Sequence, residues 1–247
     1  MIVAHSRDPR WLSNSWLIGD RDGGHAVLID TGGPVRPILD ALERHRLTLT
    51  HVLCTHHHHD HVAHNADYHE RFGCPVCGHA AESERFGDLN RTLADGDELA
   101  SGELRVRALH IPGHTTGQLA FLINDSHVAT GDTLFRGSVG GTRGPGHGTF
   151  AQLQHSIMDV LMRLPGETTV LPGHMEPTSV AREWDENPFV RHWRGLEEAG
   201  AEQVSALGRP ATLLLEAADY DGGTKDLVRF EDSGEVDLVP GSRVERR

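Results

Sequence analysis

A run of histidines in the middle of the chain carries the strongest chemical signal of the sequence. Residues 54–61 read CTHHHHDH and contain five of the nineteen histidines. In an extended loop, His56 and His58 are two residues apart and point the same way, as chelation of one cation requires. If a helix begins near His61, then Asp60 and His61 project toward a second point close by. One short segment can therefore contribute ligands to two metal ions.

The remaining histidines of the run bear on whether it is a metal site or a polar turn. His57 and His59 occupy the alternate positions and are expected to point away from the first metal. A solvated turn that happens to be rich in histidine is the competing interpretation. A lone histidine would favour that interpretation, but HxHxDH together with two further PGH turns favours a metal site.

Three later motifs complete a ligand set. His114 lies in PGHTTG, Asp132 in ATGD and His174 in VLPGH. Asp132 follows an apolar run, and its carboxylate can bridge two cations. The expected partition places His56, His58 and His114 on one metal, Asp60, His61 and His174 on the other, and Asp132 on both. Imidazole and carboxylate ligands without cysteine suit zinc, but also iron or manganese. Asp30, in IDTG, is a candidate for orienting a ligand histidine from behind; the alternative is an aspartate in the first turn of a helix.

Apolar runs that read as strands precede each of these polar motifs. Strands are predicted near 15–19, 25–30, 50–54, 75–77, 104–111, 118–124, 127–130 and 168–171, and helices at 34–46, 62–72, 149–163 and 178–186. The alternation favours a layered α/β domain. IDTGG, CTHHHHDH, HIPGHTTG, ATGD and VLPGH each follow the C-terminal end of such a run. Since loops at strand ends carry chemistry on a rigid scaffold, these five loops are expected to converge on one site.

The pattern changes after about residue 207. ATLLLEA, DLVRFED and EVDLVPGS read as short strands separated by DYDGG and DSGE turns. The sequence therefore predicts a main domain over residues 1–207 and a small β-rich extension over 208–247, with no role indicated by its residues.

Composition narrows the class of partner. The net charge is −13, from 36 acidic and 23 basic residues, which disfavours nucleic-acid binding. No stretch approaches the ~18 apolar residues of a membrane span. The first residues, MIVAHSRDPRW, resemble neither a signal peptide nor a transit peptide. These features indicate a cytoplasmic enzyme with a small-molecule substrate, and a homo-oligomer is a further expectation. The single lysine, Lys225, is attributed to coding bias and not to function.

Three cysteines, Cys54, Cys74 and Cys77, are too few for a disulfide framework. CPVC at 74–77 invites a redox or zinc-ribbon interpretation. In an extended strand, however, positions three apart lie ~10 Å apart on opposite faces, beyond disulfide reach. A structural role is therefore favoured for these cysteines.

The motifs together resemble those of a known superfamily. Thr55–His61 resembles the THxHxDH signature of the metallo-β-lactamase superfamily, and Asp30, His114, Asp132 and His174 match its four other motifs in order. The resemblance covers about residues 10–200. It implies an αββα sandwich with a dinuclear metal site at one edge of the two sheets.

Within that superfamily, GDTLFRGSVG and PGHMEPTSVAREWDENPFV are similar to the small glyoxalase II-like (hydroxyacylglutathione hydrolase-like) hydrolases. Glyoxalase II proper has a helical C-terminal domain whose basic residues bind glutathione, whereas the tail here is acidic and β-like. The small relatives usually have Arg-Thr-Asp after GSxG, where this chain has Gly141, Thr142 and Arg143. The thiol of the substrate therefore stays open.

The ligand set predicts hydrolysis. Two divalent ions can hold a bridging water and lower its pKa from ~15.7 toward ~7. A thiolate, with a pKa of ~8.5, leaves without a strong acid, whereas an amine needs a proton donor. We therefore expect a dinuclear hydrolase that cleaves the thioester of a low-molecular-weight thiol, of the hydroxyacylglutathione type, with Asp60 and Asp132 as its catalytic carboxylates. A lactonase and a persulfide dioxygenase with a single iron are the alternatives.

The Gly-rich loop 137–148 is expected to line the mouth of the pocket. Arg143 in this loop is a candidate partner for a substrate carboxylate. The alternative is a solvated loop arginine.

Overall fold

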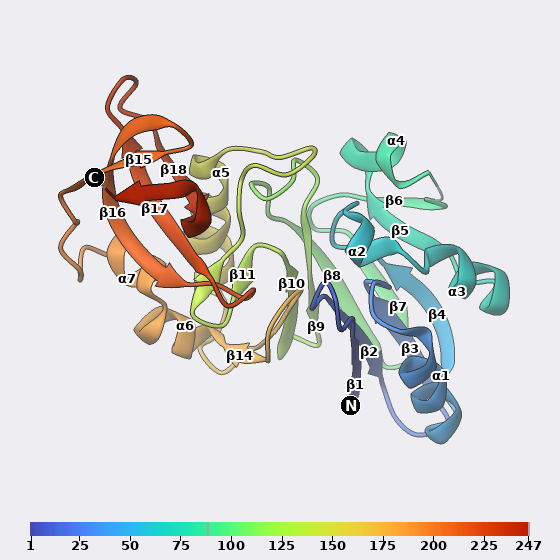
Figure 1. Ribbon diagram of the computed structural model, residues 1–247. Helices are drawn as coiled ribbons and strands as arrows, with labels where there is room; N and C mark the ends of the chain where they lie inside the picture. Colours follow the sequence, from blue (N-terminus) through green and yellow to red (C-terminus); the bar gives the residue numbers. More distant parts are fainter. Residues whose placement is uncertain (88, 247) are drawn as a thin grey trace.

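Two six-stranded β-sheets pack face to face at the centre of the molecule, and helices cover their outer faces (Figure 1). The computed structural model describes residues 1–87 and 89–246. The first sheet has the order β1 (Ile2–Arg7), β2 (Asn14–Gly19), β3 (His25–Ile29), β4 (Thr48–Leu53), β5 (Val76–His79) and β6 (Arg91–Leu93). The second has the order β14 (Thr178–Ser179), β13 (Thr169–Pro172), β10 (His127–Gly131), β9 (Leu119–Ile123), β8 (Leu104–His110) and β7 (Glu98–Ser101). The αββα sandwich that the motifs implied is confirmed.

The hydrophobic core lies in layers. Trp16 and Ile18 of β2 pack between the sheets against residues such as Phe121 of β9. The outer face of the first sheet is covered by α1 (Val35–Arg44), α3 (Asn65–Phe72) and α4 (Ser83–Phe86), and that of the second by α5 (Phe150–His155), α6 (Val180–Glu186) and α7 (Pro188–Trp193). Burial of apolar side chains on both faces of each sheet explains why most of these strands read as short apolar runs.

Strand direction brings the polar loops together. β3 and β4 are parallel neighbours, so Asp30 and the histidine run, which follow them directly, emerge at the same edge. β10 and β13 are also parallel, and they are followed by Asp132 and His174. The loop between β8 and β9 carries His114 to the same edge. The predicted convergence of the five loops is therefore confirmed.

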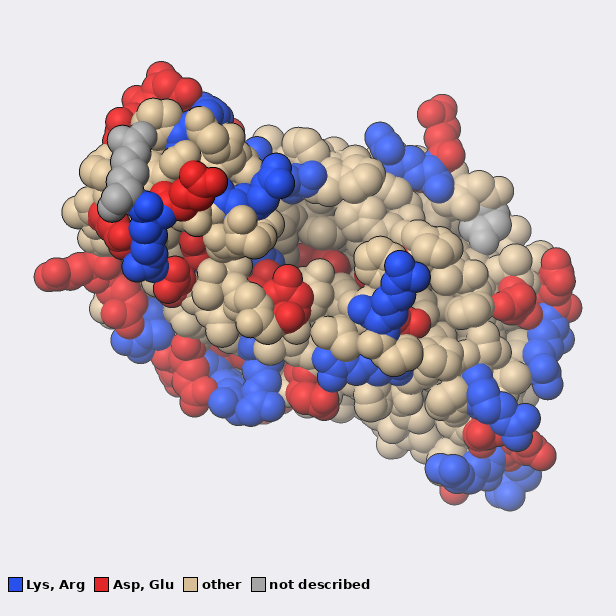
Figure 2. All heavy atoms as spheres, in the orientation of Figure 1, with Lys and Arg blue, Asp and Glu red and all other residues tan. Residues whose placement is uncertain are grey.

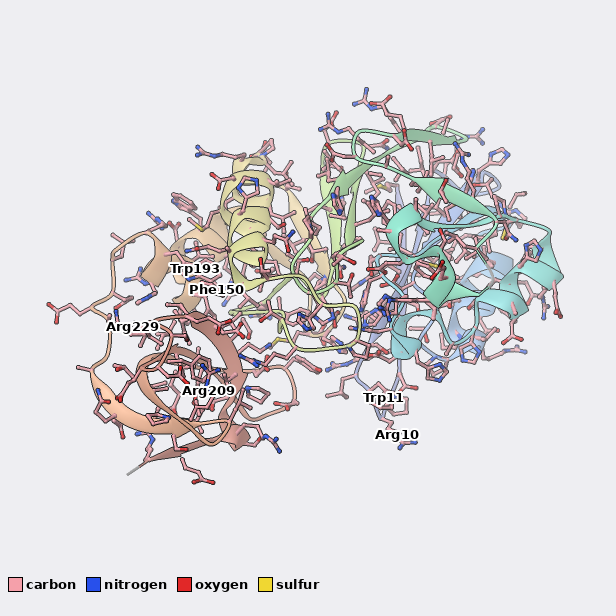
Figure 3. The ribbon with its side chains drawn as sticks, turned by 90° about the horizontal axis from the view of Figure 1, so that it is seen from above. Arg10, Trp11, Phe150, Trp193, Arg209 and Arg229 are labelled. Atoms are coloured by element: carbon pink, nitrogen blue, oxygen red, sulfur yellow. The ribbon has the colours of Figure 1, made fainter. Side chains whose placement is uncertain are left out.

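The C-terminal residues form a separate five-stranded antiparallel sheet, drawn in orange and red in Figure 1. Its order is β18 (Val236–Pro240), β17 (Thr224–Phe230), β16 (Arg209–Ala218), β15 (Glu202–Ala206) and β19 (Val244–Arg246). β15 precedes residue 208, and the division of the chain at 207 stays a prediction. Leu214 and Leu227 of this sheet share a core with Phe189 of α7. The rings of Phe150 on α5 and Trp193 on α7 contact each other beside this core, with centroids 6.0 Å apart (Figure 3).

Several details differ from the sequence-based expectations. The predicted helix 149–163 is α only over α5 and continues as a π-helical turn (Ser156–Val160) and a 3-10 turn (Leu161–Arg163). β1 was not predicted, because this edge strand buries only one of its residues fully.

No described helix is long and apolar enough to span a membrane. On the face in Figure 2, acidic and basic side chains are interspersed.

The cysteines of CPVC are buried structural residues. Cys77 lies on β5 and Cys74 precedes it, and both are free thiols. Burial raises the pKa of Cys77 to about 11, so its thiol stays protonated and unreactive near neutral pH. The structure thus agrees with the structural interpretation of these cysteines.

Candidate metal centre

The histidine run leaves β4 as an extended loop and then enters α2 (His59–Val62), as expected. Thr31 N donates to the His61 carbonyl oxygen (2.7 Å), which holds the loop after β3 against this turn. A Cβ at Gly32 would lie 1.5 Å from the Asp60 carbonyl oxygen, so the IDTGG motif needs a glycine there. Local sequence therefore fixes how the two loops touch.

His57 and His59 lie outside both clusters of candidate ligands, although the His57 ring meets the His58 ring with centroids 4.9 Å apart. His59 is exposed. His57 Nδ1 lies 2.8 Å from Oε2 of Glu82, a buried carboxylate that also accepts from His57 N (3.0 Å) and Gly117 N (2.9 Å). Glu82 therefore anchors the back of the histidine loop, a role that sequence analysis missed.

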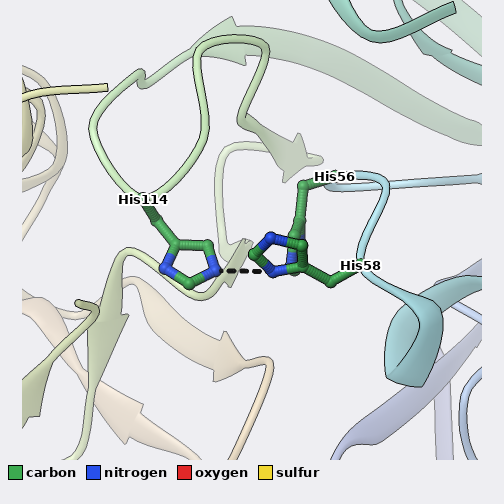
Figure 4. Close-up of side chains that lie close together, drawn as sticks. All are labelled: His56, His58 and His114. Carbon is green, nitrogen blue, oxygen red and sulfur yellow. Dashed lines mark hydrogen bonds between the residues drawn. The ribbon is translucent and has the colours of Figure 1, made fainter. Parts of the chain in front are cut away.

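His56, His58 and His114 form one cluster, with candidate ligand atoms that all lie within 4.8 Å of one another (Figure 4). His58 Nδ1 and His114 Nε2 face each other at 3.0 Å. The other ring nitrogens lie near backbone carbonyls: His58 Nε2 is 3.0 Å from the Pro145 oxygen, and His114 Nδ1 is 2.8 Å from the Gly141 oxygen. A carbonyl oxygen can only accept a hydrogen bond, so each neutral imidazole ring carries its one proton on the nitrogen that faces the carbonyl. The two facing nitrogens then present lone pairs, an arrangement that a cation between them would stabilise.

A hydrogen-bonded relay sets the orientation of two more histidines. The Thr55 hydroxyl donates to Asp30 Oδ2 (2.8 Å) and lies 3.0 Å from His56 Nδ1, from which it can therefore only accept. His56 then carries its proton on Nδ1 and presents a bare Nε2. Asp30 Oδ2 also lies 2.9 Å from His61 Nδ1, so a neutral His61 ring carries its proton on Nδ1 and leaves the lone pair of Nε2 for a metal. Asp30 thus occupies the orienting position that the sequence suggested.

Asp60, His61 and His174 form the second cluster, whose candidate ligand atoms also lie within 4.8 Å of one another. Asp60 Oδ2 is 3.4 Å from His61 Nε2 and 3.7 Å from His174 Nε2. The glycine of the PGH motif lets the backbone before His174 pass close to Asp132, because a Cβ at Gly173 would lie 2.2 Å from Asp132 Oδ1.

Asp132 lies between the two clusters. Its Oδ1 is 3.3 Å from His61 Nε2, and its Oδ2 is 3.2 Å from His174 Nε2 and 3.6 Å from His114 Nε2. All seven side chains proposed as ligands are therefore brought together, with Asp132 in the shared position that the partition expected.

Electrostatics suit these groups to bind cations. Burial lowers the pKa of His56 well below its usual value and that of His114 to about 4, which keeps both rings neutral at pH 7. Burial alone would raise the pKa of Asp132, but His174 and His61 lower it well below its usual value. Burial alone would lower the pKa of His61, but Asp132, Asp30 and Asp60 raise it well above 6.5. Carboxylates thus surround a position that attracts positive charge.

The donor set fits bound metal. The buried atoms His56 Nε2, His61 Nε2 and Asp132 Oδ1 form no hydrogen bond with any described residue. Buried polar atoms without partners are costly, and each of these three faces one of the clusters. Divalent cations would satisfy them, and imidazole nitrogen and carboxylate oxygen are ligands of zinc, iron and manganese.

Arg143 does not join the clusters. Its guanidinium pairs with Asp237 on β18 and lies 5.8 Å from the centre of the Phe230 ring. Thr142 Oγ1 also donates to Asp237 (2.6 Å), so this loop is fastened to the C-terminal sheet. The guanidinium is therefore already paired within the protein, and the KM of an Arg143 variant decides whether it also binds a substrate carboxylate.

Tyr220, in the turn between β16 and β17, is a second residue that sequence analysis missed. Its ring stacks on His174 with centroids 4.1 Å apart and planes at 15°. Phe135 of β11 (Leu134–Phe135) meets the His174 ring edge-on at 5.6 Å. The DYDGG turn offers no motif for such a role, because its contact with His174 depends on how the C-terminal sheet packs.

Comparison with known proteins identifies the family. Residues 8–174 match the family model of the metallo-beta-lactamase superfamily. The chain belongs to this superfamily. A hydroxyacylglutathione hydrolase of Acidiphilium cryptum is 36% identical over 231 residues, which cover 89% of each protein. An uncharacterized protein of Mycobacterium tuberculosis, Rv2581c, is 34% identical over 210 residues, which cover 72% of this chain and 92% of the relative.

Solved structures agree with this placement in the superfamily. ETHE1 from Myxococcus xanthus superposes with a TM-score of 0.69 at 36% identity, covering 78% of this chain and 85% of that one. TTHA1623 in a di-iron-bound form gives a TM-score of 0.63 at 31% identity, covering 76% and 100%. Together with the two His/Asp clusters, these relatives identify a metal-dependent hydrolase.

Proposed function

We propose that the protein hydrolyses the thioester of a low-molecular-weight thiol with two divalent cations. One observation carries the proposal: two clusters of ligand atoms share Asp132, and four of their histidines have hydrogen-bond partners that leave a bare nitrogen facing inward. Zinc is the expected metal, and the di-iron form of TTHA1623 makes iron a reasonable second choice.

Each cluster would hold one cation, and Asp132 would contact both. Bound divalent ions would lower the pKa of water from ~15.7 toward ~7 and polarise the carbonyl of an acyl substrate. Asp30 and Thr55 keep the bare nitrogens of His61 and His56 turned inward. Of the two catalytic carboxylates, Asp60, with 20% of its side chain exposed against 8% for Asp132, is the one more open to solvent.

The residues around the centre favour a good leaving group. Tyr220 carries the phenol that stacks beside the second cluster, and its burial, with Asp132 and Asp219 nearby, raises its pKa well above 10. Such a phenol is a poor proton donor to a departing amine. A thiolate, with a pKa of ~8.5, leaves without that help. The site is therefore better suited to a thioester or an ester than to an amide.

A substrate panel tests the proposal. Zinc-loaded protein is assayed with a D-lactoyl thioester, simple acyl thioesters and lactones, and iron-loaded protein with a persulfide while oxygen uptake is recorded. We expect thioester cleavage that Asp132→Asn reduces at least 100-fold and that His59→Gln, at an exposed position of the same loop, leaves unchanged. Cleavage of lactones alone, or oxygen uptake with the persulfide, would replace the proposal with one of the two alternatives.

A further inference from the structure

A cavity beside the second cluster is lined by Arg7, Arg136, Met175, Glu176 and Tyr220 and has a volume of ≈ 340 Å³. This Arg7–Arg136 pocket lies within the size range of small-molecule sites. Its lining comes from β1, from the segments after β11 and β13, and from the turn between β16 and β17. The C-terminal sheet thus completes a cavity that the αββα core alone leaves open.

The pocket adjoins the metal centre directly. Tyr220 belongs to its wall and also stacks on His174 at 4.1 Å. Met175 follows His174 in sequence, and its carbonyl accepts from Asn14 Nδ2 (2.8 Å), which fixes that part of the wall. Arg136 follows Phe135, whose ring contacts His174. A ligand in the pocket is therefore separated from the second cluster by one layer of side chains.

The lining of the pocket has more basic than acidic side chains, although the chain has a net charge of −13. Two arginines face one glutamate. Arg7 Nη1 lies 3.5 Å from Glu176 Oε1, which is the one ion pair of this arginine among the described residues. Arg136 forms no ion pair within residues 1–87 and 89–246. Guanidinium groups with unused donors bind carboxylates well, because the two planar groups can share two hydrogen bonds.

The Tyr220 wall is held firmly. Tyr220 N donates to Asp219 Oδ1 (2.9 Å), and Asp219 accepts from Ser138 Oγ (3.1 Å). Lys225, the single lysine of the chain, is buried with Nζ 3.0 Å from Asp219 Oδ2 and donates to the Val139 carbonyl oxygen. This lysine thus ties the C-terminal turn to the loop after Asp132, a structural role that composition alone did not reveal.

We propose that the Arg7–Arg136 pocket binds a carboxylate of the substrate, with Tyr220 of the C-terminal sheet as the wall between that carboxylate and the metal centre. The inference rests on the proposed thioesterase function and deepens it, since it assigns an anionic substrate class. The carboxylate belongs either to the thiol part or to the acyl part of the thioester, and the substrates of the test separate the two.

The kinetic test compares three thioesters on zinc-loaded protein: S-acetyl-3-mercaptopropionate, the S-succinyl ester of 2-mercaptoethanol, and neutral S-acetyl-2-mercaptoethanol. We expect one of the charged esters to have a KM at least 10-fold below that of the neutral ester. Arg136→Gln is expected to raise KM about 10-fold for that charged ester and less than twofold for the neutral one. Equal effects on charged and neutral esters, or no preference in the wild type, would overturn the proposal.

Arg10→Gln is the matched control. Arg10 lies three residues after Arg7 but is exposed, 5.4 Å from the Trp11 ring, and does not line the pocket (Figure 3). We expect this variant to keep the wild-type KM for all three esters. Tyr220→Phe should preserve the wall, while Tyr220→Ala should raise KM for the charged ester. Loss of the charged preference in the Arg10 variant would point to general surface charge and contradict a specific pocket.

A binding measurement separates the pocket from catalysis. Calorimetric titration of zinc-loaded protein uses the non-cleavable thioethers 3-(ethylthio)propionate and 4-(2-hydroxyethylthio)butyrate, each against its neutral amide. We expect one acid to bind at least 10-fold more tightly than its amide, and Arg136→Gln to abolish the difference. If neither acid binds more tightly, the pocket proposal fails, even if thioesters are cleaved. If no thioester is cleaved but the acid preference holds, the proposed function fails and the anion site stands.

Discussion

Replacement of Asp30 by asparagine should weaken metal binding without disturbing the backbone. Asp30 adopts a left-handed conformation (φ 56°), which asparagine tolerates as well as aspartate does. The carboxylate accepts three hydrogen bonds: from Thr55 N (2.8 Å), from Thr55 Oγ1 (2.8 Å) and from His61 Nδ1 (2.9 Å). An asparagine whose oxygen keeps the first of these turns an N–H group toward the other two.

The magnitude follows from the tautomer of His61. Facing an N–H group, Nδ1 of His61 must present its lone pair, and the proton then moves to Nε2, the nitrogen that would bind metal. Loss of such an orienting carboxylate costs about 10- to 100-fold in metal affinity, or about 1.4–2.7 kcal/mol. The Thr55 hydroxyl also loses its acceptor, so the orientation of His56 in the first cluster is weakened indirectly.

Thr55→Val is the matched variant, because it removes the link to His56 and leaves the contact between Asp30 and His61. We expect Asp30→Asn to weaken both zinc sites, the second more strongly, and Thr55→Val to weaken the first site alone. Competition with a chromophoric chelator measures both affinities, and circular dichroism checks the fold. Wild-type zinc affinity in Asp30→Asn, or equal weakening of both sites by Thr55→Val, would refute the relay.

Three further predictions concern stability and the loop. Lys225→Met leaves the buried Asp219 carboxylate without its cation and should lower the free energy of unfolding in urea by about 3–5 kcal/mol. The double variant Lys225→Met/Asp219→Asn should recover part of this free energy. An unchanged free energy of unfolding in Lys225→Met would contradict the buried ion pair. The pKa of His114 is about 4 in the folded protein against 6.5 in the unfolded chain, so the unfolded chain takes up the proton first as the pH falls. The free energy of unfolding of metal-free protein should therefore drop by up to about 3 kcal/mol between pH 6.5 and pH 4. Denaturation at a series of pH values measures this dependence, which His114→Gln should reduce. Arg143→Ala removes a partly exposed pair with Asp237 and should cost about 1 kcal/mol or less in thermal unfolding with KM unchanged; a raised KM would assign Arg143 to the substrate.

The positions of the candidate ligands could be predicted because each is a local consequence of a strand and the motif that follows it. The alternation of His56 and His58 in an extended loop fixed their common direction, and the turn into α2 redirected Asp60. Parallel pairing of β3 with β4 and of β10 with β13 then brought the strand ends to one edge. The strand runs and the αββα family motifs were sufficient for this part of the fold.

Residues that reach the site through long-range packing could not be predicted. Tyr220 meets His174 only because the C-terminal sheet packs onto α5 and α7, and no pattern in DYDGG announces that contact. Glu82 holds the histidine loop from a 3-10 turn (Ala80–Glu82) whose sequence reads as an ordinary polar connection. Arg143 lies in a loop near the site, which makes a substrate carboxylate a candidate partner, but no sequence pattern announces its pairing with Asp237.

The metal content of the purified protein tests the central claim most directly. After removal of metal with a chelator and reconstitution with zinc, mass spectrometric metal analysis should find two zinc ions per chain in the wild type. Asp132→Ala, which removes the shared carboxylate, should reduce the content of both sites. A single tightly bound ion in the wild type, or none, would contradict a dinuclear centre built from these seven side chains.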